Sequence, residues 1–249
     1  MSYRGTLTVW VLNSLFWMGA FPFVWWNVYG SSNEIGGITK STMLAYFFLM
    51  PVFDSLLTSW AYSNIEEDIK DGKMSGKLLQ PITYLGYVFF NERGWGLVRF
   101  ALSVIIMGII YFFARDFINL PEPSLSHLWL IAVIPLSIAL YFLFCILTGF
   151  SAFFTTRTSW FEHGWWMIQN VACGYLAPIA FYPEWAQNIL SYTPFPLLIQ
   201  TPLLIALNQL STQEILNQLG VGITWVIILT LIAIPIWKKG IKTLESVGI

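Results

Sequence analysis

The chain has 249 residues, of which 57% are hydrophobic, 18% are aromatic and only 10% are charged. An average soluble domain carries about 25% charged residues, and this much apolar surface cannot be hidden inside one soluble core of this size. Disordered, collagen-like and coiled-coil proteins are also excluded, because each needs a polar or strictly repetitive sequence. The composition therefore predicts a polytopic membrane protein.

Charge and cysteine content narrow the class further. The formal net charge of −1 argues against nucleic acid as a partner, because nucleic-acid binding needs a clustered basic face. Cys145 and Cys173 both lie in apolar stretches, so neither a disulfide framework nor a zinc site is indicated. The apolar stretch after Arg4 is too long for the core of a cleavable signal peptide, so we expect it to remain as a span.

Six stretches are long and apolar enough to cross the hydrocarbon as helices, which takes about 20 residues each. They cover residues 7–29, 42–62, 95–114, 128–150, 165–181 and 221–237. The ten-residue segments of alternating hydrophobicity that mark a membrane β-barrel are absent. The sequence therefore predicts an all-α fold, with six transmembrane helices in a single permease-sized domain over residues 1–249.

The basic residues predict how the spans face, because short cytoplasmic loops carry an excess of Lys and Arg. In the six-span arrangement nine basic residues fall on one side of the membrane, against Lys40 and Arg115 on the other. We therefore expect both termini to be cytoplasmic.

The only long cytoplasmic loop lies between the second and third spans, over residues 64–93. Near its start, Glu66 and Lys70 have the i,i+4 spacing of a helical ion pair, which predicts a short helix. Gly72 and Gly76 are expected to break that helix. A short helix of mixed charge can dock a soluble partner, although a solvated surface loop explains the same pattern equally well.

Residues 72–77 read GKMSGK and superficially resemble a phosphate-binding loop. That loop needs four residues between its glycines and a Ser or Thr after its Lys. Here three residues separate Gly72 from Gly76, and Leu78 follows Lys77. We therefore expect no nucleotide site and no cofactor in this chain.

The second informative region begins inside the predicted fifth span, where Gly174 and Pro178 interrupt the helix, and continues over residues 182–210. Proline frees backbone carbonyls, which hydrocarbon tolerates only where protein or water satisfies them. This Pro-rich stretch is too interrupted for another straight span. It predicts a pair of short helices that enter the outer leaflet as a re-entrant element.

Four polar residues inside the spans are candidates for the substrate path. Asp54 lies near the middle of the second span, where a bare carboxylate costs about 3 kcal/mol or more. It predicts either a contact with a cationic or polar substrate or an internal partner, and Arg99 in the third span is one such partner. Asn13 and Asn170 are interpreted as groups that form hydrogen bonds between helices and line or support the path.

Catalysis in this chain is not expected. The only two histidines lie 36 positions apart, which rules out a metalloprotease pair, and no G-x-S-x-G is present. Asp54 is the only carboxylate well inside a span, whereas an intramembrane aspartyl protease needs two.

These regions, in this order, carry a resemblance to a known family. The cytoplasmic loop contains GKLLQP from Gly76 to Pro81, which is similar to a G-x-L-x-x-x-L-x-x-P-like segment. After the fifth span come the family's G-x-x-x-P, F/Y-P-x-W and P-F motifs, matched here by Gly174 and Pro178, then YPEW from residue 182, then Pro194-Phe195. The chain thus resembles the permease subunits of type-2 ABC transporters, and in particular a six-span bacterial family. Family members usually begin with an additional amphipathic helix, whereas only four residues precede the run of apolar residues here.

The resemblance implies that two such permeases, identical or paralogous, enclose a path in the bacterial plasma (inner) membrane. Separate ATP-binding subunits, which hold ATP and Mg, would drive export. The cytoplasmic loop would be the coupling helix, with contacts from Glu66, Glu67, Asp68, Lys70, Asp71, Leu78, Leu79 and Pro81. The outer gate would consist of Gly174, Pro178, Pro183, Trp185, Pro194 and Phe195.

Two other classes remain as alternatives. A membrane scaffold or assembly protein without transport would tolerate changes in the cytoplasmic loop. A secondary transporter driven by an ion gradient would carry several intramembrane ionisable groups and paired broken helices in two similar halves. The near absence of both features counts against the secondary transporter. Hydrophobic drugs, dyes, lipids and lipid-linked glycans all fit the aromatic-rich interior as substrates.

Overall fold

A computed structural model describes the whole chain except residues 1–2, 116–117, 119, 156–158 and 248–249. The described part is almost entirely helical, with one hairpin of two-residue strands, β1 (Glu34–Ile35) and β2 (Ile38–Thr39). The predicted all-α class is therefore confirmed. The α-helices are α1 (Tyr3–Tyr29), α2 (Lys40–Leu57), α3 (Ala61–Lys70), α4 (Met74–Leu78), α5 (Tyr84–Ala114), α6 (Leu130–Phe150), α7 (Ser159–Ala172), α8 (Glu184–Ser191), α9 (Phe195–Leu198), α10 (Gln200–Ala206) and α11 (Thr212–Val247). Three 3-10 helices accompany them, η1 (Leu125–Trp129), η2 (Ser151–Phe153) and η3 (Ile179–Phe181).

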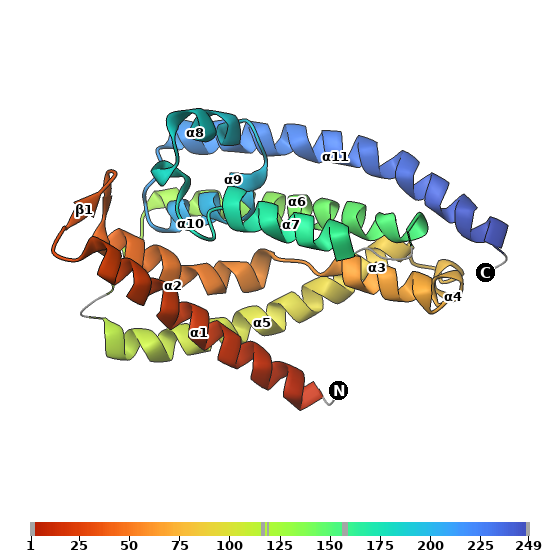
Figure 1. Cartoon of the computed structure of the whole chain (residues 1–249), viewed down its shortest axis with the longest axis horizontal. Helices are drawn as coiled ribbons and strands as arrows, with labels where there is room; N and C mark the ends of the chain where they lie inside the picture. The colour runs from red at the N-terminus through yellow and green to blue at the C-terminus, as the bar shows by residue number, and fades with distance from the viewer. Residues whose placement is uncertain (1–2, 116–117, 119, 156–158, 248–249) are drawn as a thin grey trace.

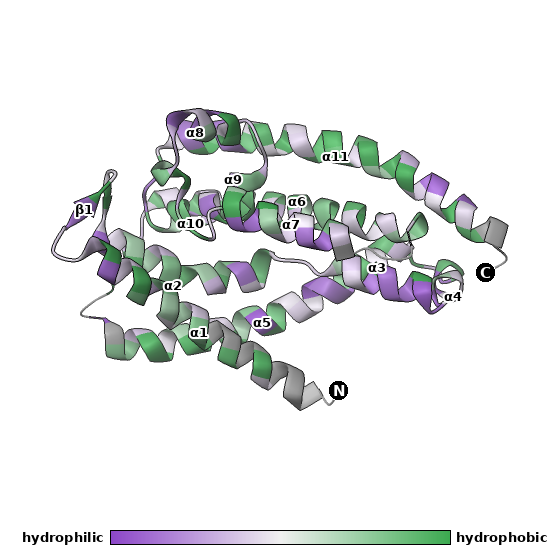
Figure 2. Cartoon of the chain, in the orientation of Figure 1, coloured by the Kyte–Doolittle hydropathy of each residue, from purple (hydrophilic) through white to green (hydrophobic). Residues whose placement is uncertain are grey.

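Within the described residues, four helical segments are long and apolar enough to cross a membrane. They are Lys40–Lys70, Tyr84–Phe113, Leu125–Phe153 and Thr212–Leu244. The long helices α5 and α11 are apolar along most of their length (Figure 2), and large side chains such as Phe113 are exposed on their outer faces. Such surfaces suit lipid rather than water. The prediction of six spans stays a prediction.

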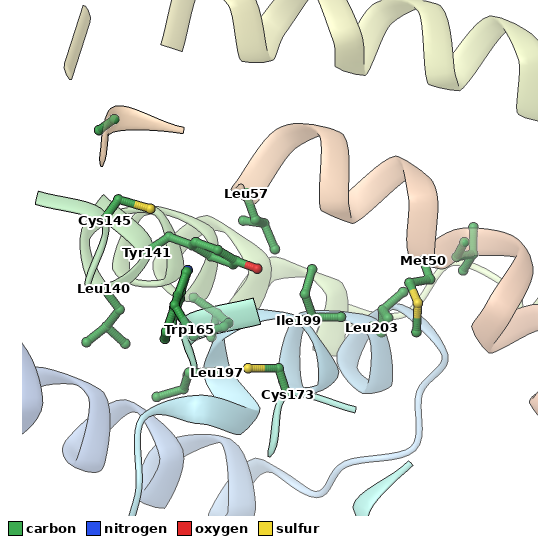
Figure 3. Packing of buried hydrophobic residues seen from close by; sticks show 14 of the residues in the cluster. Met50, Leu57, Leu140, Tyr141, Cys145, Trp165, Cys173, Leu197, Ile199 and Leu203 are labelled. Carbon is green, nitrogen blue, oxygen red and sulfur yellow. The ribbon is translucent and has the colours of Figure 1, made fainter. Parts of the chain in front are cut away.

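The long helices surround α6 (Figure 1). α11 runs along one side of α6, α2 and α3 follow one another along the other side, and α1 and α5 contact α2. Figure 3 shows the buried centre, where Leu57 of α2 and Tyr141 and Cys145 of α6 lie opposite Leu197 of α9 and Leu203 of α10. All five side chains are essentially inaccessible to solvent. The short helices α9 and α10 are thus part of the core and not surface loops.

The predicted second span, over residues 42–62, consists of two helices. α2 ends at Leu57 and α3 begins at Ala61. Two consecutive residues of α5 hold the break between them. The guanidinium of Arg93 donates to the carbonyl oxygens of Leu56 (2.9 Å) and Thr58 (2.7 Å) at the end of α2.

Glu92 serves the beginning of α3 in the same way. Its carboxylate accepts hydrogen bonds from the backbone N–H of Trp60 (2.8 Å) and the side-chain amide of Asn64 (2.6 Å). The last carbonyls of a helix favour a positive charge and its first N–H groups a negative charge. The order Glu92-Arg93 therefore matches both exposed helix ends at the break.

Two other predicted boundaries were wrong. α5 begins at Tyr84 and not near Trp95, because Glu92 and Arg93 are satisfied inside the protein and do not end the helix. α7 ends at Ala172, before the predicted limit at residue 181. Gly174 has a φ of +88°, a conformation that side chains rarely adopt, and its carbonyl accepts a hydrogen bond from the Tyr46 hydroxyl (2.9 Å).

α6 and α3 approach one another closely at Gly149. A Cβ at this position would lie 3.0 Å from the Tyr62 Cα and 3.0 Å from the Ile65 Cδ1. We expect Gly149→Ala to lower the free energy of unfolding by about 1–2 kcal/mol, because the helices must separate to admit the methyl group. Thermal unfolding of the purified protein in detergent measures the change. Gly220→Ala is the matched control, because its Cβ would meet no atom within 4 Å; equal losses in the two variants would contradict the prediction.

Candidate functional site

A cleft of about 290 Å³ lies where α1, α2 and α7 meet the connection between α2 and α3. Its aromatic lining comes from Trp17, Phe21, Phe47, Trp60, Trp165 and Trp166. Two carboxylates, Asp54 and Glu162, and two amides, Gln169 and Asn170, supply polar groups. No Lys or Arg is among the described residues that line the cleft. The cleft is therefore apolar, aromatic and acidic.

Asp54 is the end of a chain of hydrogen bonds that connects three helices. The Tyr175 hydroxyl donates to Asp54 Oδ1 (2.5 Å), and the hydroxyls of Tyr175 and Tyr141 are 3.0 Å apart. The side-chain amide of Gln169 donates to the Tyr141 hydroxyl (3.1 Å). Since Tyr175 uses its proton on Asp54, Tyr141 must donate to Tyr175. Every donor in the chain therefore points toward the carboxylate, an arrangement that strengthens each bond.

The structure brings only some of the predicted path residues together. Asp54 and Asn170 both line the cleft, whereas Arg99 does not. Arg99 attracts Asp54 electrostatically, but among the described residues no ion pair within 4.0 Å joins them. The internal partner of Asp54 is thus Tyr175 rather than Arg99. The side chain of Asn13 lies outside the described residues.

The predicted cytoplasmic helix is α3, and Glu66 and Lys70 form the expected i,i+4 ion pair in it. Gly72, with a φ of +68°, ends the helix after Asp71. Gly76 does not break a helix as predicted, because it lies inside the next one, α4. We refer to α3, α4 and the residues up to Pro81 as the α3–α4 unit.

The interior of the α3–α4 unit is held by Asp68, which is only 4% exposed. Both of its carboxylate oxygens accept hydrogen bonds from Lys77 Nζ, each at 2.7 Å, and Oδ2 also accepts one from the Tyr84 hydroxyl (2.9 Å). These bonds join α3 to α4 and to the first residue of α5. Among the residues predicted for partner contact, Asp68 therefore has a structural place inside the unit.

The outer surface of the α3–α4 unit combines charge with apolar side chains. Lys73 lies between Asp71 (2.6 Å) and Glu67 (3.6 Å), and its hydrogen bond to Asp71 raises the pKa of Lys73. Beyond α4, Leu79 is 88% exposed, and Pro81 is exposed as well. Figure 2 shows the unit as a hydrophilic region at one end of the apolar helices.

The residues predicted for the outer gate are spread between core and surface. Gly174 and Pro194 are buried, and Phe195 stacks on Phe144 of α6 with ring centroids 5.6 Å apart. Trp185, in contrast, is 68% exposed on α8. Pro178 and Pro183 precede η3 and α8 as N-cap residues. The gate role of this set stays a prediction.

Three functional candidates escaped the sequence analysis. Tyr141 and Tyr175 connect Asp54 to α6 and α7, and Glu92 begins α3. A signal existed for Tyr141, because tyrosines in membrane proteins gather at the interfaces and this one lies deep inside an apolar stretch. Tyr175 follows a helix end that the sequence did not place, so nothing marked it.

The comparisons with known proteins point to one family. A family model described as "ABC-2 family transporter protein" matches residues 15–248, which is nearly the whole chain. No curated protein and no solved structure matches the chain.

Proposed function

Because the chain belongs to the ABC-2 transporter family, in which the membrane subunits are transport components and not enzymes, we propose that it is the permease subunit of an ATP-driven exporter. Two copies, or this chain and a paralogue, enclose the substrate path in the plasma membrane. Separate ATP-binding subunits hold ATP and Mg and drive the cycle. The α3–α4 unit is the observation that carries this proposal.

The α3–α4 unit has the properties of a docking element. Its interior is fixed by the hydrogen bonds of Asp68, so it is rigid, and its surface offers Glu67 and Asp71 beside the exposed Leu79. A rigid apolar tip with a charged surround is the usual anatomy of a protein interface. Both termini lie at the same end of the molecule as this unit (Figure 1), which supports a cytoplasmic position for all three.

The α3–α4 unit also reaches the cleft through the chain itself. Thr58, Ser59 and Trp60, which connect α2 to α3, line the cleft together with Asp54. A displacement of α3 by a docked partner therefore acts on residues of the candidate path. This continuity supports the assignment of α3 as the coupling helix.

We assign six membrane crossings to the chain, with both termini cytoplasmic. α7 has 14 residues, which is about 21 Å of helix and too short to cross about 30 Å of hydrocarbon. The short helices α8, α9 and α10 complete its path as the re-entrant element. They lie at the end of the molecule opposite the α3–α4 unit (Figure 1).

The proposal predicts that Leu79→Glu separates the chain from its ATP-binding subunit. A tagged chain is extracted from its native membrane in mild detergent, and the stoichiometry of associated proteins and the ATPase activity are measured. We expect at least a tenfold loss of the associated subunit, because a charge replaces the exposed apolar contact at the centre of the interface. Leu125→Glu is the matched control: Leu125 is 83% exposed at the other end of the molecule, and its substitution is expected to leave the complex intact.

Two results would contradict the proposal. A chain that is isolated alone in every mild detergent, with no ATPase activity, would favour a scaffold or a gradient-driven transporter. A complex that survives Leu79→Glu and the triple change Glu67→Ala, Asp68→Ala and Leu79→Ala would place the coupling contact elsewhere.

A further inference from the structure

We infer that the cleft between α1, α2 and α7 binds amphiphilic organic cations, and that these are the substrate class of the exporter. The inference rests on the proposed function for the word substrate, but the binding itself does not. Its basis is the combination of an acidic interior with aromatic walls in a single cavity.

The charge of the lining selects the sign of the ligand. Asp54 and Glu162 both line the cleft, and the described lining residues include no Lys or Arg. An anion placed there meets two carboxylates in an environment of low dielectric constant, where repulsion is much stronger than in water. A neutral ligand gains nothing from these carboxylates, whereas a cation is attracted.

Asp54 has an oxygen available for such a ligand. Its Oδ1 accepts the hydrogen bond from Tyr175, while Oδ2 accepts none from the residues that the structure describes. Arg99 attracts the carboxylate without lining the cleft. A carboxylate inside a membrane protein is costly unless a charge compensates it, so a cation bound in the cleft would lower that cost.

The walls supply the second half of the recognition. Trp60 and Trp166 both line the cleft and are 54% and 63% exposed, so their ring faces are open to a ligand. Trp and other aromatic faces attract organic cations by about 0.5–2 kcal/mol each. With a volume of about 290 Å³, the cleft is at the small end of ligand sites. A flat cation of one or two aromatic rings fits these limits.

The test uses N-methyl-4-phenylpyridinium, a flat two-ring cation, in radiolabelled form. The complex is purified from its native membrane with whatever subunits accompany it and placed in phosphatidylcholine nanodiscs, which carry no net charge. Equilibrium dialysis measures cation binding, and gel analysis of the same sample scores the ATP-binding subunit. 4-Phenylbenzoate, similar in shape and opposite in charge, is the competing ligand.

Asp54→Asn is expected to weaken cation binding about tenfold or more, because the charge-assisted contact is lost. Trp166→Leu is expected to weaken it about threefold. Tyr175→Phe leaves the carboxylate in place and is expected to bind the cation at least as tightly as the unaltered chain. Glu184→Gln, which removes an exposed carboxylate outside the cleft, is the control and is expected to change nothing.

Equal cation binding by Asp54→Asn and the unaltered chain would overturn the inference, as would competition by 4-phenylbenzoate. Either result in a sample that contains the ATP-binding subunit leaves the proposed function standing. Conversely, Asp54-dependent binding in a sample without that subunit supports the cation site and counts against the exporter.

Discussion

Glu92→Ala is expected to lower the free energy of unfolding by about 3 kcal/mol, one of the two largest effects we predict. The Glu92 side chain is 6% exposed and accepts hydrogen bonds from the Trp60 backbone N–H and the Asn64 amide. Its removal leaves both donors without an acceptor in a buried place, at about 1–3 kcal/mol for each group. The N-terminus of α3 also loses its neighbouring negative charge.

The thermal midpoint of unfolding in detergent, followed by tryptophan fluorescence, is expected to fall by about 6–12 °C in Glu92→Ala. Glu122→Ala, which removes an exposed carboxylate, is expected to change the free energy by less than about 0.5 kcal/mol. If both variants unfolded at the temperature of the unaltered chain, the break between α2 and α3 would be held by something other than α5.

Lys77→Met is expected to open the α3–α4 unit by leaving the Asp68 carboxylate buried without its cation. Breaking a buried ion pair costs about 3–5 kcal/mol. The Lys77 side chain is 26% exposed, which reduces the expected loss to about 2–3 kcal/mol. Hydrogen exchange of the amides in residues 74–78 is expected to accelerate by about 30- to 150-fold, since local opening governs it.

Two further variants separate this pair from ordinary surface charge. The double variant Asp68→Asn, Lys77→Met is expected to recover at least half of the protection, because the neutral amide still accepts the Tyr84 hydroxyl. Lys70→Met removes an exposed pair with Glu66 and is expected to cost about 0.5 kcal/mol. A double variant less protected than Lys77→Met alone would show that Asp68 is not the group left unsatisfied.

The sequence predicted what depends on local composition. Apolar stretches marked the long helices, and the Glu66–Lys70 spacing marked α3. The boundaries failed where distant groups satisfied local polarity. Glu92 and Arg93 read as the end of a span, yet α2 and α3 supply their partners, and α5 continues through them from Tyr84.

The candidate site divides in the same way. Asp54 was recognisable because a carboxylate in an apolar stretch is rare. Its partner Tyr175 lies 121 positions away in the chain, and no local pattern predicts a contact of that separation. The aromatic side chains of the cleft were read as anchors at the membrane interface, because their convergence on one cavity depends on how α1, α2 and α7 pack.

The break between α2 and α3 has a mechanical consequence. α3 has ten residues, which makes it a rod about 15 Å long. Arg93 and Glu92 fasten both helix ends at the break to α5, so α3 is free to turn only about the end that begins at Trp60. A displacement of about 2.6 Å at its far end then corresponds to a rotation of about 10° at Trp60, by the geometry of a rod of that length. A continuous helix from Lys40 to Lys70 would instead bend slightly over its whole length. The break concentrates the rotation on the ring that forms part of the cleft wall.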